Sequence, residues 1–244
     1  MISELPDPTL RSVDLRQVEI LDLPLALVIL HRELPIGGRI HVRLTADIEP
    51  DAQQALVEGG GFGIEHRGAS DSLCVRRADT LPDFVASKMR LLICGLNPSL
   101  HAAQSGIPFS RPGNRFWPAA VRAGLVDQAR DCIAALVRGI GFTDLVKRAT
   151  RRTDELSSAE YRRGIERVAA LARMFEPATF CFVGLDGYRR AVDPKAVTGW
   201  LPGGFAGCSA YLMPSTSGLN VHASVETATR HLRIAASGRR FIAS

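Results

Sequence analysis

The first residues in this chain that could carry chemistry are Gly95, Asn97 and Pro98, which follow an apolar run. A glycine lets the backbone approach a ligand closely, and a proline restricts the residue before it to an extended conformation. An asparagine fixed in this way can accept a hydrogen bond from water through its oxygen and donate through its nitrogen. Two interpretations remain open: Asn97 positions a water molecule for hydrolysis, or it only closes the turn after a strand.

A second group of candidate residues occupies positions 213–220, with the sequence MPSTSGLN. Hydroxyls and backbone N–H groups can contact phosphates without reading base sequence. An apolar side chain at the tip of a loop, here Leu219, can insert into a stack of bases. The alternative is that this segment caps a helix and that Leu219 folds back into the core.

The elements that must position these loops are predicted from residue 89 onward. Compact apolar runs at 89–96 (MRLLICGL), 178–185 (ATFCFVGL) and 209–213 (SAYLM) indicate buried parallel strands. Helices are predicted to begin at Asn114 and to span 131–137, 157–175, 187–192 and 224–235, the third with a Ser157–Glu160 capping box. Residues 141–146 are read as a loop or a short strand. We therefore expect a three-layer α/β/α domain with a central, mostly parallel sheet over residues 89–244. Ligands bind such sheets at the carboxyl ends of the strands, where both candidate loops begin.

Residues 1–88 are expected to form a small α+β appendage. An apolar helix or buried strand at 23–34 is followed by a turn, a strand at 39–44, a short helix at 51–58 and strands at 63–66 and 72–76. This order faintly resembles the C-terminal half of a class I methyltransferase. The glycine-rich loop that would hold the methyl donor is missing, so we expect a degenerate structural unit and infer no methyl transfer.

Composition narrows the class of protein. The net charge of +5 over 244 residues is compatible with a polyanionic partner but does not identify one. The N-terminus is polar and does not resemble a secretory signal, and the most apolar run, 21–30, is too short to span a bilayer. We expect a cytoplasmic protein that holds no metal or iron–sulfur cluster, because its cysteines are scattered singly, at Cys74, Cys94, Cys132, Cys181 and Cys208.

Four motifs in order resemble one known family. They are GLNP at 95–98, GIPFSRPGNRFW at 106–117, GFTDLVKRAT at 141–150 and PSTSGLN at 214–220. Together they resemble the mismatch-specific uracil/thymine-DNA glycosylases of the uracil-DNA glycosylase superfamily. The resemblance covers residues 89–236 and leaves the first 88 residues outside.

The resemblance implies a role for each matched residue. Asn97 would hold the attacking water, Phe109 would stack on a base flipped out of the duplex, and Leu219 would fill the gap that the base leaves. The Leu219–Asn220–Val221 sequence departs from relatives that carry an Arg or another polar residue there, so contacts to the opposite guanine do not carry over. The implied base pocket comprises Gly95, Leu96, Pro98, Ser99, Ala102 and Phe109, the DNA-contacting loop comprises Ser215, Thr216, Ser217, Gly218, Leu219 and Asn220, and Asn114, Arg115 and Trp117 would hold the pocket together.

Asp144 and Ala102 stand at positions that vary among relatives of the implied family. The carboxylate of Asp144 could act as a general base on water, accept a hydrogen bond from the bound base, or cap the following turn. Ala102 replaces a serine of some relatives, and its small apolar side chain could admit a bulkier or methylated base.

The expected function is that of a monofunctional DNA glycosylase, which hydrolyses the N-glycosidic bond and initiates base excision repair. Its expected partner is double-stranded DNA with a mispaired or damaged base: uracil opposite guanine, and also thymine or other deaminated or etheno bases. We expect a monomer that needs no cofactor and no metal. Two other classes stay open: a non-catalytic module that binds mispairs or lesions, and a small-molecule enzyme such as a nucleoside hydrolase. The Leu219 loop favours duplex DNA over free nucleosides.

Overall fold

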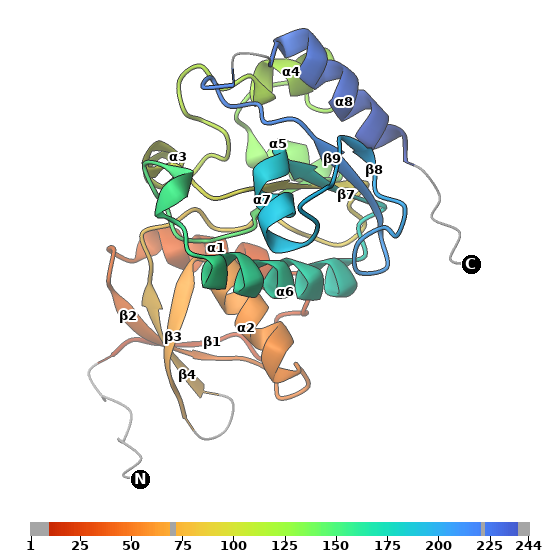
Figure 1. Cartoon of the computed structure of the whole chain (residues 1–244). Coiled ribbons are helices and arrows are strands. Elements are labelled where there is room, and N and C mark those ends of the chain that lie inside the picture. The colour runs from red at the N-terminus through yellow and green to blue at the C-terminus, as the bar shows by residue number, and fades with distance from the viewer. Residues whose placement is uncertain (1–9, 69–71, 221–222, 239–244) are drawn as a thin grey trace.

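The computed structural model describes residues 10–68, 72–220 and 223–238, which form two sheets with helices packed around them (Figure 1). The smaller sheet belongs to the N-terminal residues, and the larger one carries the candidate loops. Among the described residues, no helix is both long and apolar enough to cross a membrane.

The larger, central sheet has the strand order β6-β5-β7-β9-β8. Its four parallel strands are β5 (Leu91–Gly95), β6 (Ile140–Asp144), β7 (Thr179–Val183) and β9 (Ser209–Met213), and every residue in them is buried. The short β8 (Gly199–Trp200) adds an antiparallel edge. Because these strands are buried on both faces, they appear in the sequence as continuous apolar runs.

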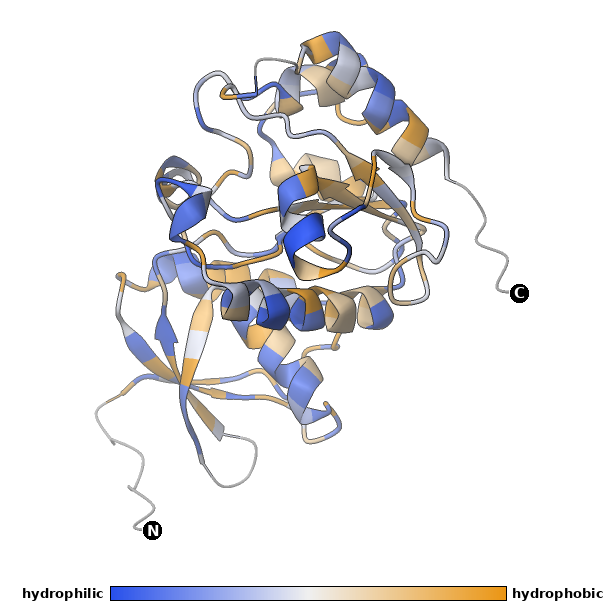
Figure 2. Cartoon of the chain, in the orientation of Figure 1, coloured by the Kyte–Doolittle hydropathy of each residue, from blue (hydrophilic) through white to orange (hydrophobic). Residues whose placement is uncertain are grey.

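Helices cover both faces of the central sheet, which confirms the three-layer α/β/α fold. Alternate side chains of each strand point to opposite faces, so Leu92 belongs to one hydrophobic cluster and Ile93 to the other. Figure 2 shows the consequence: the central strands are mostly hydrophobic, whereas α8 alternates between hydrophilic and hydrophobic residues. One face packs against α6 (Ser158–Phe175) and α7 (Leu185–Ala191), and the other against α4 (Phe116–Arg122), α5 (Cys132–Val137) and α8 (Val225–Ser237).

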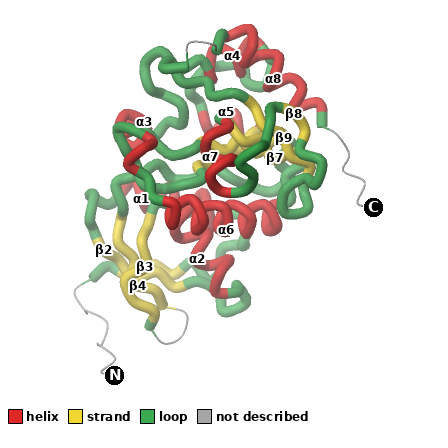
Figure 3. Tube along the Cα trace, in the orientation of Figure 1, coloured by secondary structure: helices red, strands yellow, loops and turns green. Residues whose placement is uncertain are grey.

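The predicted start of α6 is confirmed in detail. Ser157 Oγ accepts a hydrogen bond from the Glu160 backbone N–H, and Glu160 accepts one from the Ser157 N–H, which is a complete capping box. The helix α3 (Leu100–Ser105), which Ser99 caps by accepting a hydrogen bond from the Ala102 backbone N–H, was not predicted. Figure 3 shows long loops gathered on the side of the central sheet where α3 lies.

The N-terminal layer has its own sheet, in the order β1-β2-β4-β3. Its first strand is parallel to β2, and the other neighbours are antiparallel. The segment 23–34, for which a helix and a buried strand were both open, is a helix. The predicted strands and short helix are present, and β1 was not predicted. The elements are β1 (Ser12–Asp14), α1 (Leu23–Glu33), β2 (Arg39–Arg43), α2 (Pro50–Gly59), β3 (Phe62–Arg67) and β4 (Ser72–Arg77).

This N-terminal layer shares a hydrophobic core with the central sheet. Leu27, Leu56 and Val75 belong to the same buried cluster as Leu92 and Leu171. Figure 1 shows α6 lying between the N-terminal layer and the central sheet, and the backbone of Phe84 pairs with that of Phe142 on the outer edge of β6. A domain boundary at residue 88 stays a prediction, but the residues just before it already pack against the central sheet.

Gly164 gives a test of how tightly α6 packs on the central sheet. A Cβ at this position would overlap the backbone oxygen of Leu145, which follows β6 and cannot move freely. Alanine normally stabilises a helix interior by roughly 0.5–1 kcal/mol relative to glycine. We expect Gly164→Ala instead to lower the free energy of unfolding by about 1–3 kcal/mol, as overpacking does. Urea denaturation measures this, with Gly203→Ala as the control because its added Cβ meets nothing within 4 Å. Equal stability of Gly164→Ala and the parent would contradict the close packing.

Candidate functional site

A pocket of about 530 Å³ lies at the carboxyl ends of β5, β6, β7 and β9. Residues that follow each of these four strands line it, together with residues of the 106–117 loop. Parallel strands bring their carboxyl ends to one edge of a sheet, and this is where ligands bind in such folds. The predicted loops, far apart in sequence, therefore meet around one cavity.

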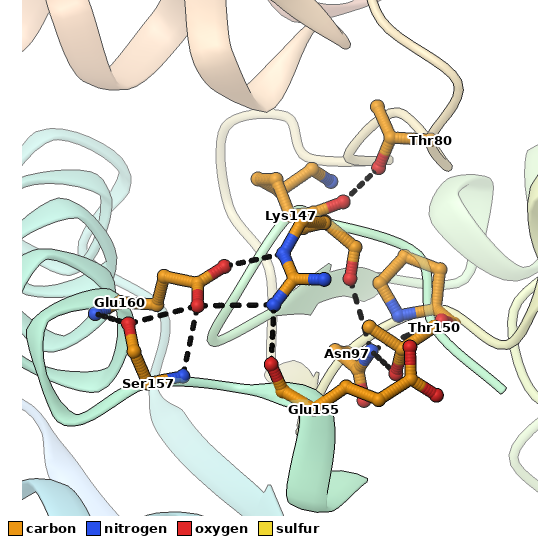
Figure 4. Close-up of polar contacts among 9 residues, drawn as sticks. Thr80, Asn97, Lys147, Thr150, Glu155, Ser157 and Glu160 are labelled. Carbon is orange, nitrogen blue, oxygen red and sulfur yellow. Dashed lines mark hydrogen bonds and ion pairs between the residues drawn. The ribbon is translucent and has the colours of Figure 1, made fainter. Parts of the chain in front are cut away.

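Asn97 is held in one orientation at the wall of this pocket. Its Nδ2 donates to the backbone oxygen of Arg148 at 2.9 Å and to Thr150 Oγ1 at 2.8 Å (Figure 4). A third contact joins Nδ2 to the oxygen of Pro98 at 3.2 Å. Because the nitrogen is committed to the protein, the side-chain oxygen is the group left to accept a hydrogen bond from a ligand or a water. Asn97 is half-buried and lines the pocket, so its side chain is not enclosed in the core.

The support for Asn97 continues to the start of α6. The guanidinium of Arg148 pairs with Glu160, with 2.6 Å between Nε and Oε1, and donates to the backbone oxygen of Glu155 at 2.6 Å. Glu160 is in turn the capping-box partner of Ser157 (Figure 4). The backbone oxygen that receives the Asn97 amide is thus held by a well-ordered helix start.

Asp144 is the last residue of β6 and lies opposite Gly95 in the register of the sheet. The residue is 7% exposed, and its carboxyl group occupies the space beside Gly95, where any Cβ would overlap it. The same Cβ position is 3.4 Å from the ring edge of Phe109. The carboxyl therefore lies close to this ring in the pocket. None of the described residues donates a hydrogen bond to it, which argues against its being a turn cap.

The environment of Asp144 favours its neutral form more than water does. Burial raises the pKa of Asp144 to about 6; Lys147 and Arg167 oppose the rise, and the nearby Asp83 adds to it. The carboxyl can therefore exchange a proton near neutral pH. Titratable groups with raised pKa values in a cleft are typical of functional sites.

Phe109 supplies a flat apolar surface to the pocket. Its ring stacks on Phe116 with 4.3 Å between centroids and 20° between planes. The neighbouring Trp117 is buried and donates from Nε1 to the oxygen of Pro108 at 2.7 Å. Phe109 has a φ of 55°, an uncommon conformation for a residue other than glycine. The loop is thus fixed by its aromatic neighbours in a conformation that aims this ring into the pocket.

Residues 214–220 form a tight loop with Leu219 at its exposed tip, 75% exposed. Arg115 donates from its guanidinium to the oxygens of Ser217 and Asn220, at 3.0 and 3.3 Å. Ser215 Oγ and Ser217 Oγ accept hydrogen bonds from backbone N–H groups two residues ahead, so their own hydroxyl hydrogens are left to donate. The alternative in which Leu219 folds into the core is wrong.

Two further residues of this loop are closely packed against the rest of the protein. Thr216 is buried, and its hydroxyl has no partner among the described residues, so its side chain does not face a DNA backbone. Gly218 packs its Cα against the backbone of Gly113 and is not part of the pocket wall. Val221, the position where relatives vary, lies outside the described residues.

The other predicted site residues meet in the pocket, and further residues join them. Thr150, Arg151 and Arg152 come from the loop after β6, and Asp186 from the first turn of α7. Thr150 ends the motif at 141–150, but no role was predicted for it or for the other three, because their place depends on how distant segments pack. Within the described residues, no three His, Cys, Asp or Glu side chains come together as ligands for a metal. The predicted residues that line the pocket are Gly95, Leu96, Asn97, Pro98, Ser99, Ala102, Phe109, Asn114, Asp144, Ser215, Thr216, Ser217, Leu219 and Asn220.

One comparison with known proteins bears on this site. The family model of the uracil DNA glycosylase superfamily matches residues 82–235, which include every strand of the central sheet and every residue that lines the pocket except Leu81. The superfamily comprises glycosylases, hydrolases that remove uracil from DNA. The match covers more than half of the chain, and it agrees with the three-layer fold. This chain therefore belongs to the uracil DNA glycosylase superfamily.

Proposed function

We propose that this protein is a monofunctional, mismatch-specific DNA glycosylase. Its substrate would be double-stranded DNA with uracil opposite guanine, or with a related mispaired or damaged base, and it would act as a cytoplasmic monomer. The observation that carries the proposal is the fixed amide of Asn97, which shares a pocket with Asp144 and Phe109 below the exposed tip of Leu219.

Base flipping is the first step of the proposed reaction. A glycosidic bond inside a stacked duplex cannot be reached, so the nucleotide must rotate out, at a cost of a few kcal/mol that is smallest at a mispair. Leu219 would occupy the gap, and the hydroxyls of Ser215 and Ser217 would donate to phosphates. The flipped base would stack on Phe109, a contact worth about 1–3 kcal/mol.

Hydrolysis is the second step. The oxygen of Asn97 would accept a hydrogen bond from the attacking water and orient it, but an amide cannot take up the proton of that water. Asp144, with its pKa of about 6, is largely ionised at neutral pH and could take up this proton as a general base. The closeness of Asp144 to the Phe109 ring supports a second candidate role, in which the carboxylate accepts a hydrogen bond from an N–H group of the base.

Asn97→Ala tests the assignment of the water-positioning residue. We expect base release from a duplex with one G·U pair to fall below detection, because the amide oxygen is lost, while binding of the duplex persists. Strand scission in hot alkali measures release, and a gel-shift assay measures binding. Gln104→Ala, at an exposed amide on α3, is the matched control and should retain activity. Unchanged scission by Asn97→Ala would reject the role, and tight mispair binding without any abasic product from the parent protein would favour the non-catalytic module.

Asp144→Asn separates the two roles of the carboxylate. Both roles need the ionised form, so the rate of the parent protein should fall as the pH drops through about 6. If Asp144 is the general base, the variant should lose about 10²–10⁴-fold in single-turnover rate and lose this acid limb. If Asp144 only accepts a hydrogen bond from the base, the amide oxygen of the variant can replace it and most of the rate should remain. A variant with full rate and an unchanged acid limb would exclude both roles.

Leu219→Ala tests the insertion into the duplex. We expect the single-turnover rate on the G·U duplex to fall at least about tenfold, which corresponds to roughly 1.4 kcal/mol of lost stabilisation of the flipped state. The fluorescence of 2-aminopurine placed beside the mispair reports flipping directly and should fall in parallel. Val197→Ala, at an exposed valine remote from the pocket wall, is the control. Equal flipping by Leu219→Ala and the parent would contradict the insertion.

A further inference from the structure

A buried ion cluster, defined here as Asp83, Lys147 and Arg167, lies behind the pocket. Arg167 Nη1 is 2.7 Å from Asp83 Oδ2, and Lys147 Nζ is 2.8 Å from Asp83 Oδ1. The side chain of Asp83 is 2% exposed and that of Arg167 is 4% exposed. Thr143 Oγ1 also donates to Asp83 Oδ1 at 2.8 Å. Burial acts to raise the pKa of Asp83, but Arg167, Lys147 and these hydrogen bonds bring it below its ordinary value, so Asp83 is ionised.

The buried ion cluster is joined directly to the end of β6. Arg167 Nη2 donates to the backbone oxygen of Asp144 and, at 3.0 Å, to Thr143 Oγ1. Lys147 donates to the backbone oxygen of Leu81, a residue of the segment between β4 and β5. The backbone of Asp144 is therefore held by the same guanidinium that binds Asp83.

Asp83 is itself placed by the N-terminal layer. Its backbone N–H donates to the oxygen of Gly59 at 2.7 Å, at the end of α2. A Cβ at Gly59 would come within 2.5 Å of Asp83 Oδ2, so the end of the helix and the carboxylate are in close contact. The next residue, Phe84, pairs with Phe142 on the edge of β6. The N-terminal layer thus holds the carboxylate of Asp83 in place beside the end of β6.

The charges around Asp144 come from several elements. The charged groups nearest to it are those of the buried ion cluster: Lys147 from the loop after β6, Arg167 from α6 and Asp83 from the segment between β4 and β5. From β5 it faces Cys94, whose thiol pKa is raised well above its ordinary value by burial, so this group is neutral. The two cations and Asp83 leave one positive charge, which an ionised Asp144 balances. The remaining charged groups of the pocket wall are Arg111, Arg151, Arg152 and Asp186.

We propose that Asp83 is a positioning residue for Asp144: through Arg167 and Lys147 it holds the end of β6 and sets the charge that the Asp144 carboxyl experiences. This gives the N-terminal layer a part in the reaction, since the layer places Asp83. The inference rests on the proposed role of an ionised Asp144. Loss of the Asp83 charge leaves two uncompensated cations behind the pocket and favours ionisation of Asp144, whereas loss of the Lys147 charge disfavours it.

Opposite shifts in two variants test the proposal. The carboxyl carbon of Asp144 is followed by NMR in the full-length protein as the pH is varied, and Asp144→Asn identifies its signal. We expect the midpoint to fall by about one pH unit in Asp83→Asn and to rise by about one in Lys147→Met. The acid limb of uracil release from the G·U duplex should move in the same directions. Asp127→Asn, which removes a carboxylate from an exposed pair with Arg138, should leave the midpoint unchanged.

The outcomes separate a positioning role from a structural one. A merely structural Asp83 would lower stability without moving the midpoint, and unchanged midpoints in the folded variants would overturn the proposal. If Asp83→Asn does not fold, Lys147→Met still tests whether the charges of the buried ion cluster act on Asp144. A raised midpoint supports this part of the inference, and an unchanged midpoint overturns it. The NMR midpoint is independent of activity. Opposite midpoint shifts in a protein that releases no uracil would therefore reject the proposed function and leave the link from Asp83 to Asp144 standing.

Discussion

The parallel pairing of β5 with β6, in the register that sets Gly95 opposite Asp144, is the constraint on which the pocket depends. Only a glycine at position 95 leaves room for the carboxyl group of Asp144. The two segments stay paired beyond the strands, because Leu145 and Val146 donate to the oxygens of Gly95 and Leu96, and Thr150 donates to that of Pro98. This continued pairing brings the hydroxyl of Thr150 to the amide of Asn97. One register therefore places both candidate catalytic side chains.

The pocket contains groups that a fold selected only for stability would avoid. Asp144 is buried, and none of the residues that the structure describes donates a hydrogen bond to its carboxyl; burying a polar group without a partner costs free energy. Phe109 has a positive φ, which is also unfavourable for a residue with a side chain. Both lie in one cavity of a superfamily whose members cleave bonds to bases. Their joint presence fits a site in which stability is given up for reactivity.

The sequence predicted the strands that are buried on both faces, because such strands are continuous apolar runs. It left β6 undecided, since Thr143, Asp144 and Lys147 interrupt the apolar pattern there. In the structure these polar residues contact Asp83 or Arg167, which are distant in the sequence. Thr143 is 60 residues from Asp83 and 24 residues from Arg167. Strands of two or three residues, such as β8 and β1, are too short to show a period. The pocket loops could be found from their own composition. The contact of Thr150 with Asn97 and the place of Asp83 depend on residues that are distant in the sequence, and they could not be predicted.

Phe109 and the 214–220 loop are joined by contacts of residues 113–116. Phe116 stacks on Phe109, and the preceding residue, Arg115, binds the 214–220 loop through its backbone N–H and its guanidinium. Gly218 lies against Gly113, which closes the same contact from the other side. A loop that is already ordered pays little entropy when it meets a ligand. In the proposed function Leu219 would enter the duplex while the pocket with the Phe109 ring receives the base, and the contacts through residues 113–116 would couple these two events.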